Sequence, residues 1–243
     1  MYQSETATVR CIECRATEDR PGPVQVDAGV AGASAYRQYE RRKAIREARV
    51  RARLGNTLGA LALAIAGEAQ STTAWRRGSI GESKLAQALA GVAGVTVLND
   101  RRVPRTRGNI DHIVIAPAGV FVVDTKLYKG LIRVLDRGGW LNRDERLYVG
   151  RRDCSRLADN MTWQVASVQR VINSAGVRFA NILVQPVLCF VDGDWSLLTP
   201  QSYRGVRLEG LRSIKQLVIR HQILSTADIA AMTQVLAVAF PTK

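Results

Sequence analysis

The sequence predicts an α/β fold, in which a mixed central sheet is flanked by helices. Two runs rich in Val, Ile and Phe, Ile110–Pro117 and Gly119–Asp124, are joined by a turn and bounded by Pro or Gly, as paired strands are. A third apolar run, Val187–Val191, is continuous rather than alternating, which is typical of a strand covered on both faces. Helical periodicity before and after these runs predicts helices on both sides of the sheet.

The N-terminal part of the chain differs from the rest in composition. Residues 17–35 contain Pro-Gly-Pro and several small residues, which predicts a flexible linker. Tyr36–Arg53 carries eight basic and two acidic residues without an apolar stripe, which predicts a solvated helix. Such a helix is either a solubilising spacer or an arm that binds nucleic acid by releasing counterions. Leu58–Ile65 is expected to be a short helix packed on the domain.

The remaining elements follow from periodicity and capping signals. Ser79-Ile-Gly-Glu82 matches a capping box, which places a helix over Arg77–Val92. Further strands are expected at Val95–Val103, Leu131–Leu135 and Trp140–Val149. Further helices are expected at Ser155–Asn173, at Ser213–Leu224 and after Ser225-x-x-Asp228. His221 is expected at the edge of the core. We therefore divide the chain into residues 1–35, 36–74 and 75–243, the last being the main domain.

The hairpin carries the chemistry. Side chains alternate along a strand, so Asp111 enters its strand where Asp124 and Lys126 leave theirs. The hairpin thus gathers two carboxylates and an ammonium at one end of an apolar sheet. Buried carboxylates cost several kcal/mol unless a cation compensates, and oxygen ligands suit Mg²⁺. The alternative interpretation is an Asp–Lys ion pair at the strand ends.

Glu82 also has two interpretations. It is the third residue of a capping box, so it could simply cap its helix. It also precedes Leu85 by three positions and Leu89 by seven, which puts it on the helix face that meets the sheet. A carboxylate on that face could reach the hairpin site directly or through water.

Together these residues resemble a known family. Gly81-Glu82, Ile110-Asp111-His112 and the run from Gly119 to Lys126 look like the nuclease-related domain, NERD, of the PD-(D/E)XK restriction-endonuclease-like superfamily, over roughly 75–191. The resemblance implies a divalent-metal phosphodiesterase site built from Glu82, Asp111, Asp124 and Lys126, with Mg²⁺ or Mn²⁺ as cofactor.

The same resemblance draws attention to Gln164. The family often carries Asn-Pro-x-x-Gln, whereas this chain has Asn160-Met-Thr-Trp-Gln164, without the proline. Gln164 would orient the Lys126 side of the site or bind substrate, or it would only satisfy backbone groups. His112 points to the opposite face from Asp111 and is expected to be a packing residue.

The charge of the chain points to a polyanion. The net charge is +14, and it is spread over both parts, with 13 basic and 8 acidic groups in residues 1–81 and 22 and 13 in residues 82–243. Nucleic acid, with DNA favoured, is the first partner expected, and an anionic membrane surface is the second. Next to a phosphodiesterase site, basic side chains could grip backbone phosphates, and the candidates are Arg101, Arg102, Arg105, Arg107 and Lys129. The alternative for the arginines is a solvated loop.

Cysteines and apolar segments bear on location. The first 25 residues contain no apolar signal region, and Leu54–Gly67 is too short and too interrupted to span a bilayer. We therefore expect a cytoplasmic protein with reduced thiols and no membrane insertion. Cys11 and Cys14 form half of a zinc-binding pattern and are expected to be either a remnant or the second half of a site whose first half would precede residue 1, with less than one zinc per chain. Cys154 and Cys189 are expected to be small core residues.

Three functions follow from these observations. The leading one is metal-dependent hydrolysis of nucleic-acid phosphodiesters. The second is a nuclease-like fold that binds nucleic acid without cutting it, since a fold does not guarantee activity. The third is a membrane-surface adaptor using Tyr36–Arg53, which lacks the Trp, Phe and Leu face that such helices need.

Overall fold

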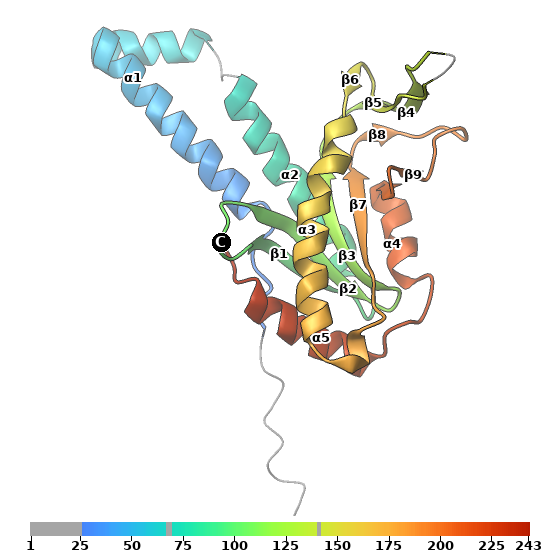
Figure 1. Ribbon diagram of the computed structural model, residues 1–243. Helices are drawn as coiled ribbons and strands as arrows, with labels where there is room; N and C mark the ends of the chain where they lie inside the picture. Colours follow the sequence, from blue (N-terminus) through green and yellow to red (C-terminus); the bar gives the residue numbers. More distant parts are fainter. Residues whose placement is uncertain (1–25, 67–69, 140–141) are drawn as a thin grey trace, which may run out of the picture.

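The computed structural model describes residues 26–66, 70–139 and 142–243 (Figure 1). Cys11 and Cys14 lie outside these residues. The helices are α1 (Ala33–Ala66), α2 (Gln70–Ala90), α3 (Ser155–Ser174), α4 (Leu211–Ile219) and α5 (Thr226–Ala239), with a short 3-10 turn at Val177–Phe179. The strands are β1 (Thr96–Arg102), β2 (Asn109–Ala116), β3 (Gly119–Lys126), β4 (Gly130–Asp136), β5 (Glu145–Val149), β6 (Arg152–Asp153), β7 (Val184–Phe190), β8 (Gly193–Asp194), β9 (Ser202–Tyr203) and β10 (Val206–Glu209).

The main sheet has six strands in the order β1-β2-β3-β7-β10-β9. The strands β1, β2 and β3 form an antiparallel meander, and β3, β7 and β10 run parallel to one another. The crossover between β3 and β7 contains α3, as a parallel connection requires. The predicted α/β fold with a mixed sheet is therefore confirmed, and the carboxyl ends of three neighbouring parallel strands meet at one edge.

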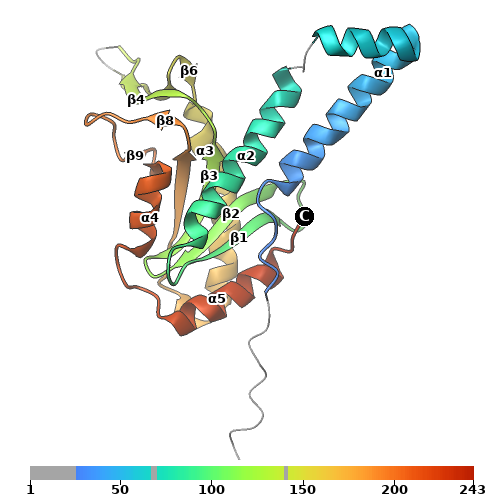
Figure 2. The same ribbon diagram turned by 180° about the vertical axis from the view of Figure 1, so that it is seen from behind.

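Helices cover both faces of this sheet. On one face α3 and α5 pack against the strands, with Met161, Val168 and Met232 in the core. On the other face α2 and α4 contribute Leu85, Leu89, Ile214 and Val218. Figures 1 and 2 show the two layers from opposite sides. Burial on both faces explains why β7 is apolar at successive positions, and it places Cys189 in the core as expected.

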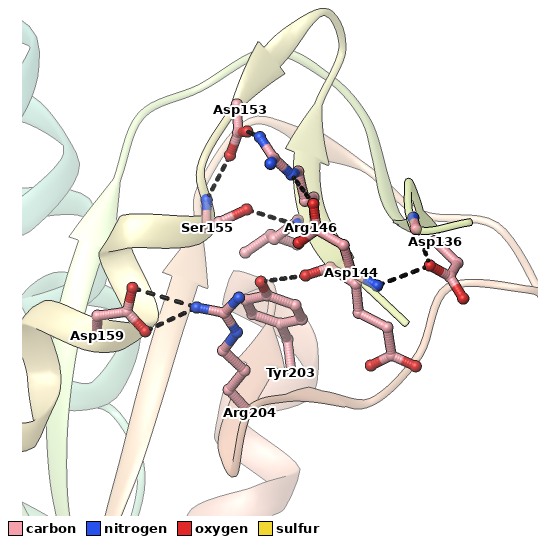
Figure 3. A network of polar contacts seen from close by, with 11 residues as sticks. Asp136, Asp144, Arg146, Asp153, Ser155, Asp159, Tyr203 and Arg204 are labelled. Atoms are coloured by element: carbon pink, nitrogen blue, oxygen red, sulfur yellow. Dashed lines mark hydrogen bonds and ion pairs between the residues drawn. The ribbon is translucent and has the colours of Figure 1, made fainter. Parts of the chain in front are cut away.

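A smaller sheet, in the order β6-β5-β4-β8, stands at the carboxyl edge of the main sheet. Polar contacts fix it to its neighbours (Figure 3). The hydroxyl of Tyr203 donates to the carbonyl of Glu145 at 2.7 Å, and Arg204 donates to both oxygens of Asp159 on α3 at 3.0 and 3.2 Å. These bonds join β5 to β9, and the turn after β9 to α3.

The N-terminal helix differs from the prediction. Helix α1 projects from the body as an arm, and it kinks at Gly55, whose φ of 76° is non-helical (Figure 1). The prediction that Leu58–Ile65 packs on the domain is wrong, because Leu58, Leu61 and Ile65 are 63%, 58% and 77% exposed. Apolar composition favoured a packed helix, but the first part of α1 leads away from the body, so the segment after the kink lies at the far end of the arm (Figure 1). No helix within the described part of the chain is long and apolar enough to cross a membrane.

Three local predictions are also corrected. Residues 26–32 are not a flexible linker, since the carbonyl of Ala28 accepts the N–H of Asn99 at 2.7 Å beside β1. Ser79 is not an N-cap, because α2 begins nine residues earlier, at Gln70. His221 is exposed and lies beyond the end of α4. In contrast, α3 and the capping box of Ser225 and Asp228 at α5 occur as predicted.

Candidate metal and nucleic-acid site

The hairpin brings Asp111 and Asp124 together. In the antiparallel pair β2–β3, His112 lies opposite Val123, so the next rung sets Asp111 beside Asp124. The two carboxyl groups are within hydrogen-bonding reach of each other. Asp124 is 7% exposed and is also ion-paired with Lys126. The structure therefore contains both the carboxylate pair and the Asp–Lys ion pair that the sequence suggested.

Helix α2 adds the third carboxylate. Gly81 lies against the end of β3, where an added Cβ would stand 3.3 Å from the Cβ of Leu127 and 3.5 Å from Thr125. This close approach sets Glu82, which is only 6% exposed, beside the hairpin. Because Ser79 and Glu82 lie well inside α2, Glu82 does not cap the helix. Among the described residues, its Oε2 atom has no hydrogen-bond partner.

The pKa values of Glu82, Asp111 and Lys126 indicate that the nearby positive charge does not balance the carboxylates. Burial, reinforced by nearby Asp100, raises the pKa of Glu82 from 4.5 to about 7. Burial and the neighbouring Asp124 and Glu82 raise the pKa of Asp111 well above its ordinary value. Burial lowers the pKa of Lys126, but Asp124 and Asp111 outweigh it, so the pKa is raised overall. One ammonium thus faces three carboxyl groups, and an added cation would stabilise their charged forms.

The donor set suits a hard divalent cation, although the side chains are not assembled as a cage. Within residues 26–66, 70–139 and 142–243, no three His, Cys, Asp or Glu side chains are arranged to hold a metal ion. Asp124 is turned to Lys126 rather than to Glu82. The unpartnered Oε2 of Glu82 and the neighbouring carboxyl of Asp111 are oxygen donors of the kind that Mg²⁺ or Mn²⁺ takes. The donor chemistry therefore suits such an ion, whereas the described side chains do not enclose one.

A cleft of about 620 Å³ opens over these groups, and we call it the carboxylate cleft. Glu82, Asp111, Thr125 and Lys126 lie in its wall. Three cations line it, Lys126, Arg77 and Arg152, and the guanidinium of Arg152 lies 4.5 Å from the ring centre of Tyr128. Arg77 and Arg152 were not predicted from the sequence. Arg152 reaches the cleft only because β6 folds over β3, which no local motif indicates.

Residues 77–191 match the family model described as the nuclease-related domain. These residues form a NERD domain. The match begins inside α2 and ends just after β7, so it contains Glu82, the hairpin and the crossover helix α3. The mixed sheet with helices on both faces is consistent with the restriction-endonuclease-like fold. No curated protein and no solved structure matches the chain.

Of the basic residues predicted to bind phosphate, one is buried in the NERD domain and the other four are exposed. Arg101 is 1% exposed, and it donates to the carbonyl of Phe240 at 3.3 Å and to the carbonyl of Asp27. Its assignment as a phosphate ligand is therefore wrong, because its guanidinium ties β1 to both ends of the described chain. Arg102, Arg105, Arg107 and Lys129 are exposed but lie outside the described lining of the carboxylate cleft.

Two further polar residues of the NERD domain, Gln164 on α3 and His112 on β2, are outside the described lining of the cleft. Gln164 on α3 is partly buried, and its Oε1 atom has no partner in the described part of the chain. His112 is buried, and its Nδ1 lies 2.9 Å from Oδ1 of Asn99. Burial lowers the pKa of His112 to about 4. A neutral histidine bonded to a neighbouring strand has the packing role predicted for it.

Proposed function

We propose that this NERD-domain protein is a metal-dependent nuclease that hydrolyses phosphodiester bonds of nucleic acid, with DNA as the favoured substrate. The observation that carries the proposal is the group of buried Glu82 and Asp124 with half-buried Asp111, which shares one ammonium and leaves Oε2 of Glu82 unpartnered among the described residues. A stable fold normally satisfies buried carboxylates. Their accumulation in a cleft lined by cations suits a site that receives a metal ion and a phosphate.

The roles follow from position. Asp111 and Asp124 would hold Mg²⁺ or Mn²⁺, and Glu82 would bind the ion directly or through water. The bound ion supplies Lewis acidity and lowers the pKa of a water molecule. Lys126 would position the attacking water and offset negative charge that develops on the phosphate. Arg77 and Arg152, which line the same cleft, hold the flanking phosphates by paired N–H donors.

The competing proposal is nucleic-acid binding without cleavage. It is favoured by one specific observation, namely that Asp124 is ion-paired with Lys126. In that case the chain would bind through charge alone. Contacts to six to ten phosphates would make the affinity fall by roughly 10³–10⁵ between 50 and 200 mM salt.

The deciding experiment incubates the chain with linear, circular, single-stranded and double-stranded DNA, and with RNA, in Mg²⁺, Mn²⁺ or chelator. We expect cleavage only with a divalent ion, and none by Lys126→Met. Lys126→Met should still bind the metal, because an ammonium is not a ligand, and isothermal calorimetry measures this. Salt-dependent binding without cleavage in either metal would leave the non-catalytic function standing. Binding that does not respond to salt would contradict electrostatic docking in both proposals.

A further inference from the structure

A second cavity, of about 930 Å³, lies beside the carboxylate cleft, and we call it the Trp195 pocket. It opens at the carboxyl ends of β7 and β10, where the chain turns into α4, and Figure 2 shows β8 and β9 grouped at that end of α4. In open α/β sheets, ligands bind in the crevice outside the carboxyl ends of the strands. Nothing in the roles assigned above uses this pocket.

The pocket is joined to the proposed site by hydrogen bonds between neighbouring strands. Val191 in its wall donates its N–H to the carbonyl of Lys126 at 3.0 Å. Glu209, also in the wall, shares a rung with Cys189, which in turn shares a rung with Thr125. At about 4.8 Å between strands, Glu209 lies about 10 Å from β3, whereas Val191 adjoins its end. The pocket wall therefore begins beside β3 and spans about three nucleotides at the 3.4 Å rise of a stacked strand.

The lining suits a flat group with apolar faces and a polar edge. The floor is apolar, with Phe190 and Leu208 almost fully buried. Trp195 forms part of the wall with 41% of its surface exposed. Gly210 makes room for the indole, since an added Cβ would lie 3.0 Å from its Nε1 atom. An exposed indole over an apolar floor is a stacking surface.

Polar groups around the pocket complete a nucleotide-binding arrangement. Glu209 is buried and accepts hydrogen bonds from Nη2 and Nε of Arg207 at 2.8 and 3.2 Å. The two charges therefore neutralise each other, and the ion pair forms a fixed polar edge of the pocket. The exposed amide of Gln216 can bond the rim of a base. Arg212, in the first turn of α4, is exposed at the mouth and can hold a phosphate.

We propose that the Trp195 pocket takes one unpaired nucleobase of the substrate strand, stacked on the Trp195 indole, with the adjoining phosphate at Arg212. This inference rests on the proposed function, because it takes nucleic acid as the ligand. It adds that the strand is held single-stranded at this point and that the carboxylate cleft and the pocket bind the same strand. Trp195 is a positioning residue, since it would contact substrate away from the reacting atoms.

The test measures binding of a labelled single-stranded DNA in chelator, with one abasic site moved along the strand. In the wild-type chain, one position should be sensitive, with loss of its base weakening binding roughly 5- to 150-fold. Trp195→Ala should weaken binding of the intact strand by a similar factor and should abolish that sensitivity. Trp195→Phe should restore most of the affinity and most of the abasic sensitivity, which separates loss of stacking from damage to the fold. Trp163→Ala is the matched control, because its indole is 40% exposed but lies on α3, and it should keep the abasic pattern.

The outcomes separate the two proposals. Equal abasic profiles for the wild type and Trp195→Ala, in a chain that cleaves with Mg²⁺, would overturn the pocket and leave the nuclease intact. The predicted profile in a chain that never cleaves would overturn the nuclease and keep the pocket. Saturation of the pocket by a free mononucleotide without any abasic sensitivity would also overturn the proposal, because the ligand would then not be the strand. Arg212→Gln should lower the slope of log affinity against log salt by about 0.7 and keep the abasic pattern.

Discussion

Asp100 and Glu82 are both buried carboxylates, close enough for Asp100 to raise the pKa of Glu82, yet their surroundings differ. Oδ2 of Asp100 accepts the N–H of Ser34 at 2.7 Å and a bond from Arg37 at 3.4 Å, and its Oδ1 accepts from Asn109 at 3.1 Å. Glu82 accepts the N–H of Gly32 but leaves Oε2 without a partner among the described residues. One carboxylate is fully bonded, and the other is not.

The difference separates structural from functional burial. Asp100 bonds the first turn of α1 and the start of β2, so it fixes the arm to the sheet. A buried charge with three donors costs little and stabilises the fold. Lys126 and the N–H of Gly32 offset only part of the cost of burying Glu82, as is expected where a ligand supplies the missing charge. The comparison can be tested by removing each charge in turn.

The largest effect is expected for Asp124→Asn, which removes a carboxylate from the group that contains Glu82. Cleavage should fall by at least roughly 10³-fold, because the metal contributes several kcal/mol of transition-state stabilisation. Without metal, the fold should be as stable as the wild type or more so, since repulsion between Asp111 and Asp124 is relieved. Thermal melts with and without Mg²⁺, run beside the cleavage assay, check both statements.

The metal response supplies the control for this variant. At a metal concentration 100 times Kd, the wild type should gain about 2.7 kcal/mol of stability, and Asp124→Asn should gain much less. If the group is only an ion pair, Asp124→Asn should instead lose about 3–5 kcal/mol, because Lys126 would keep a buried charge. A large loss together with a wild type that ignores Mg²⁺ would contradict the metal site.

A smaller effect is expected from titration of Glu82 in chelator. Its pKa is about 7 in the folded chain and 4.5 ordinarily, so the folded state holds the proton more tightly. The stability that this proton provides is complete below about pH 4.5 and is lost as the pH rises to about 7, a total of roughly 3 kcal/mol. Glu82→Gln should lack this fall. Urea denaturation of both chains between pH 5 and 8 measures the difference, and parallel curves would show that Glu82 is satisfied after all.

The opposite behaviour is expected for Asp100→Asn. Asparagine tolerates the positive φ of 49° at this position, so the backbone is not a confounding factor. The change weakens bonds from Ser34, Arg37 and Asn109 and should cost roughly 2 kcal/mol. Activity per folded molecule and the Mg²⁺ response should stay near the wild-type values. Loss of cleavage without loss of stability would mean that Asp100 belongs to the functional group.

These contrasts show which parts of the molecule local sequence could predict. The hairpin was predictable because β2 and β3 are adjacent in the chain, and a two-stranded register fixes Asp111 beside Asp124. The bonds of Asp100 and the burial of Arg101 were not, because their partners come from residues 27, 34 and 240, far along the chain. Arg101 looked like its exposed neighbours, since charge alone does not reveal tertiary partners.

Helix limits and clefts depend even more on tertiary structure. The capping box at Ser79 was a false start signal, because α2, which packs against α1, begins about two and a half turns earlier, at Gln70. The apolar segment after Gly55 was predicted to be a packed helix from its composition alone, which does not show that the arm holds it away from the core. Arg77 on α2 and Arg152 on β6 line the same cleft although they are 75 residues apart in the chain, so no local pattern could predict that they share a site.

The smallest effect is expected from the two arginines of the cleft. It extends the comparison of partnered and unpartnered charges from carboxylates to arginines. Arg77→Gln and Arg152→Gln should each lower the slope of log affinity against log salt by about 0.9 on duplex DNA, because each would release about one counterion. Arg102→Gln, exposed but outside the described cleft lining, is the matched control and should change the slope less. Fluorescence anisotropy in chelator from 50 to 200 mM salt gives the three slopes. If Arg102→Gln has the largest effect, the strand runs along the loop between β1 and β2, and the phosphate path proposed for the carboxylate cleft is wrong.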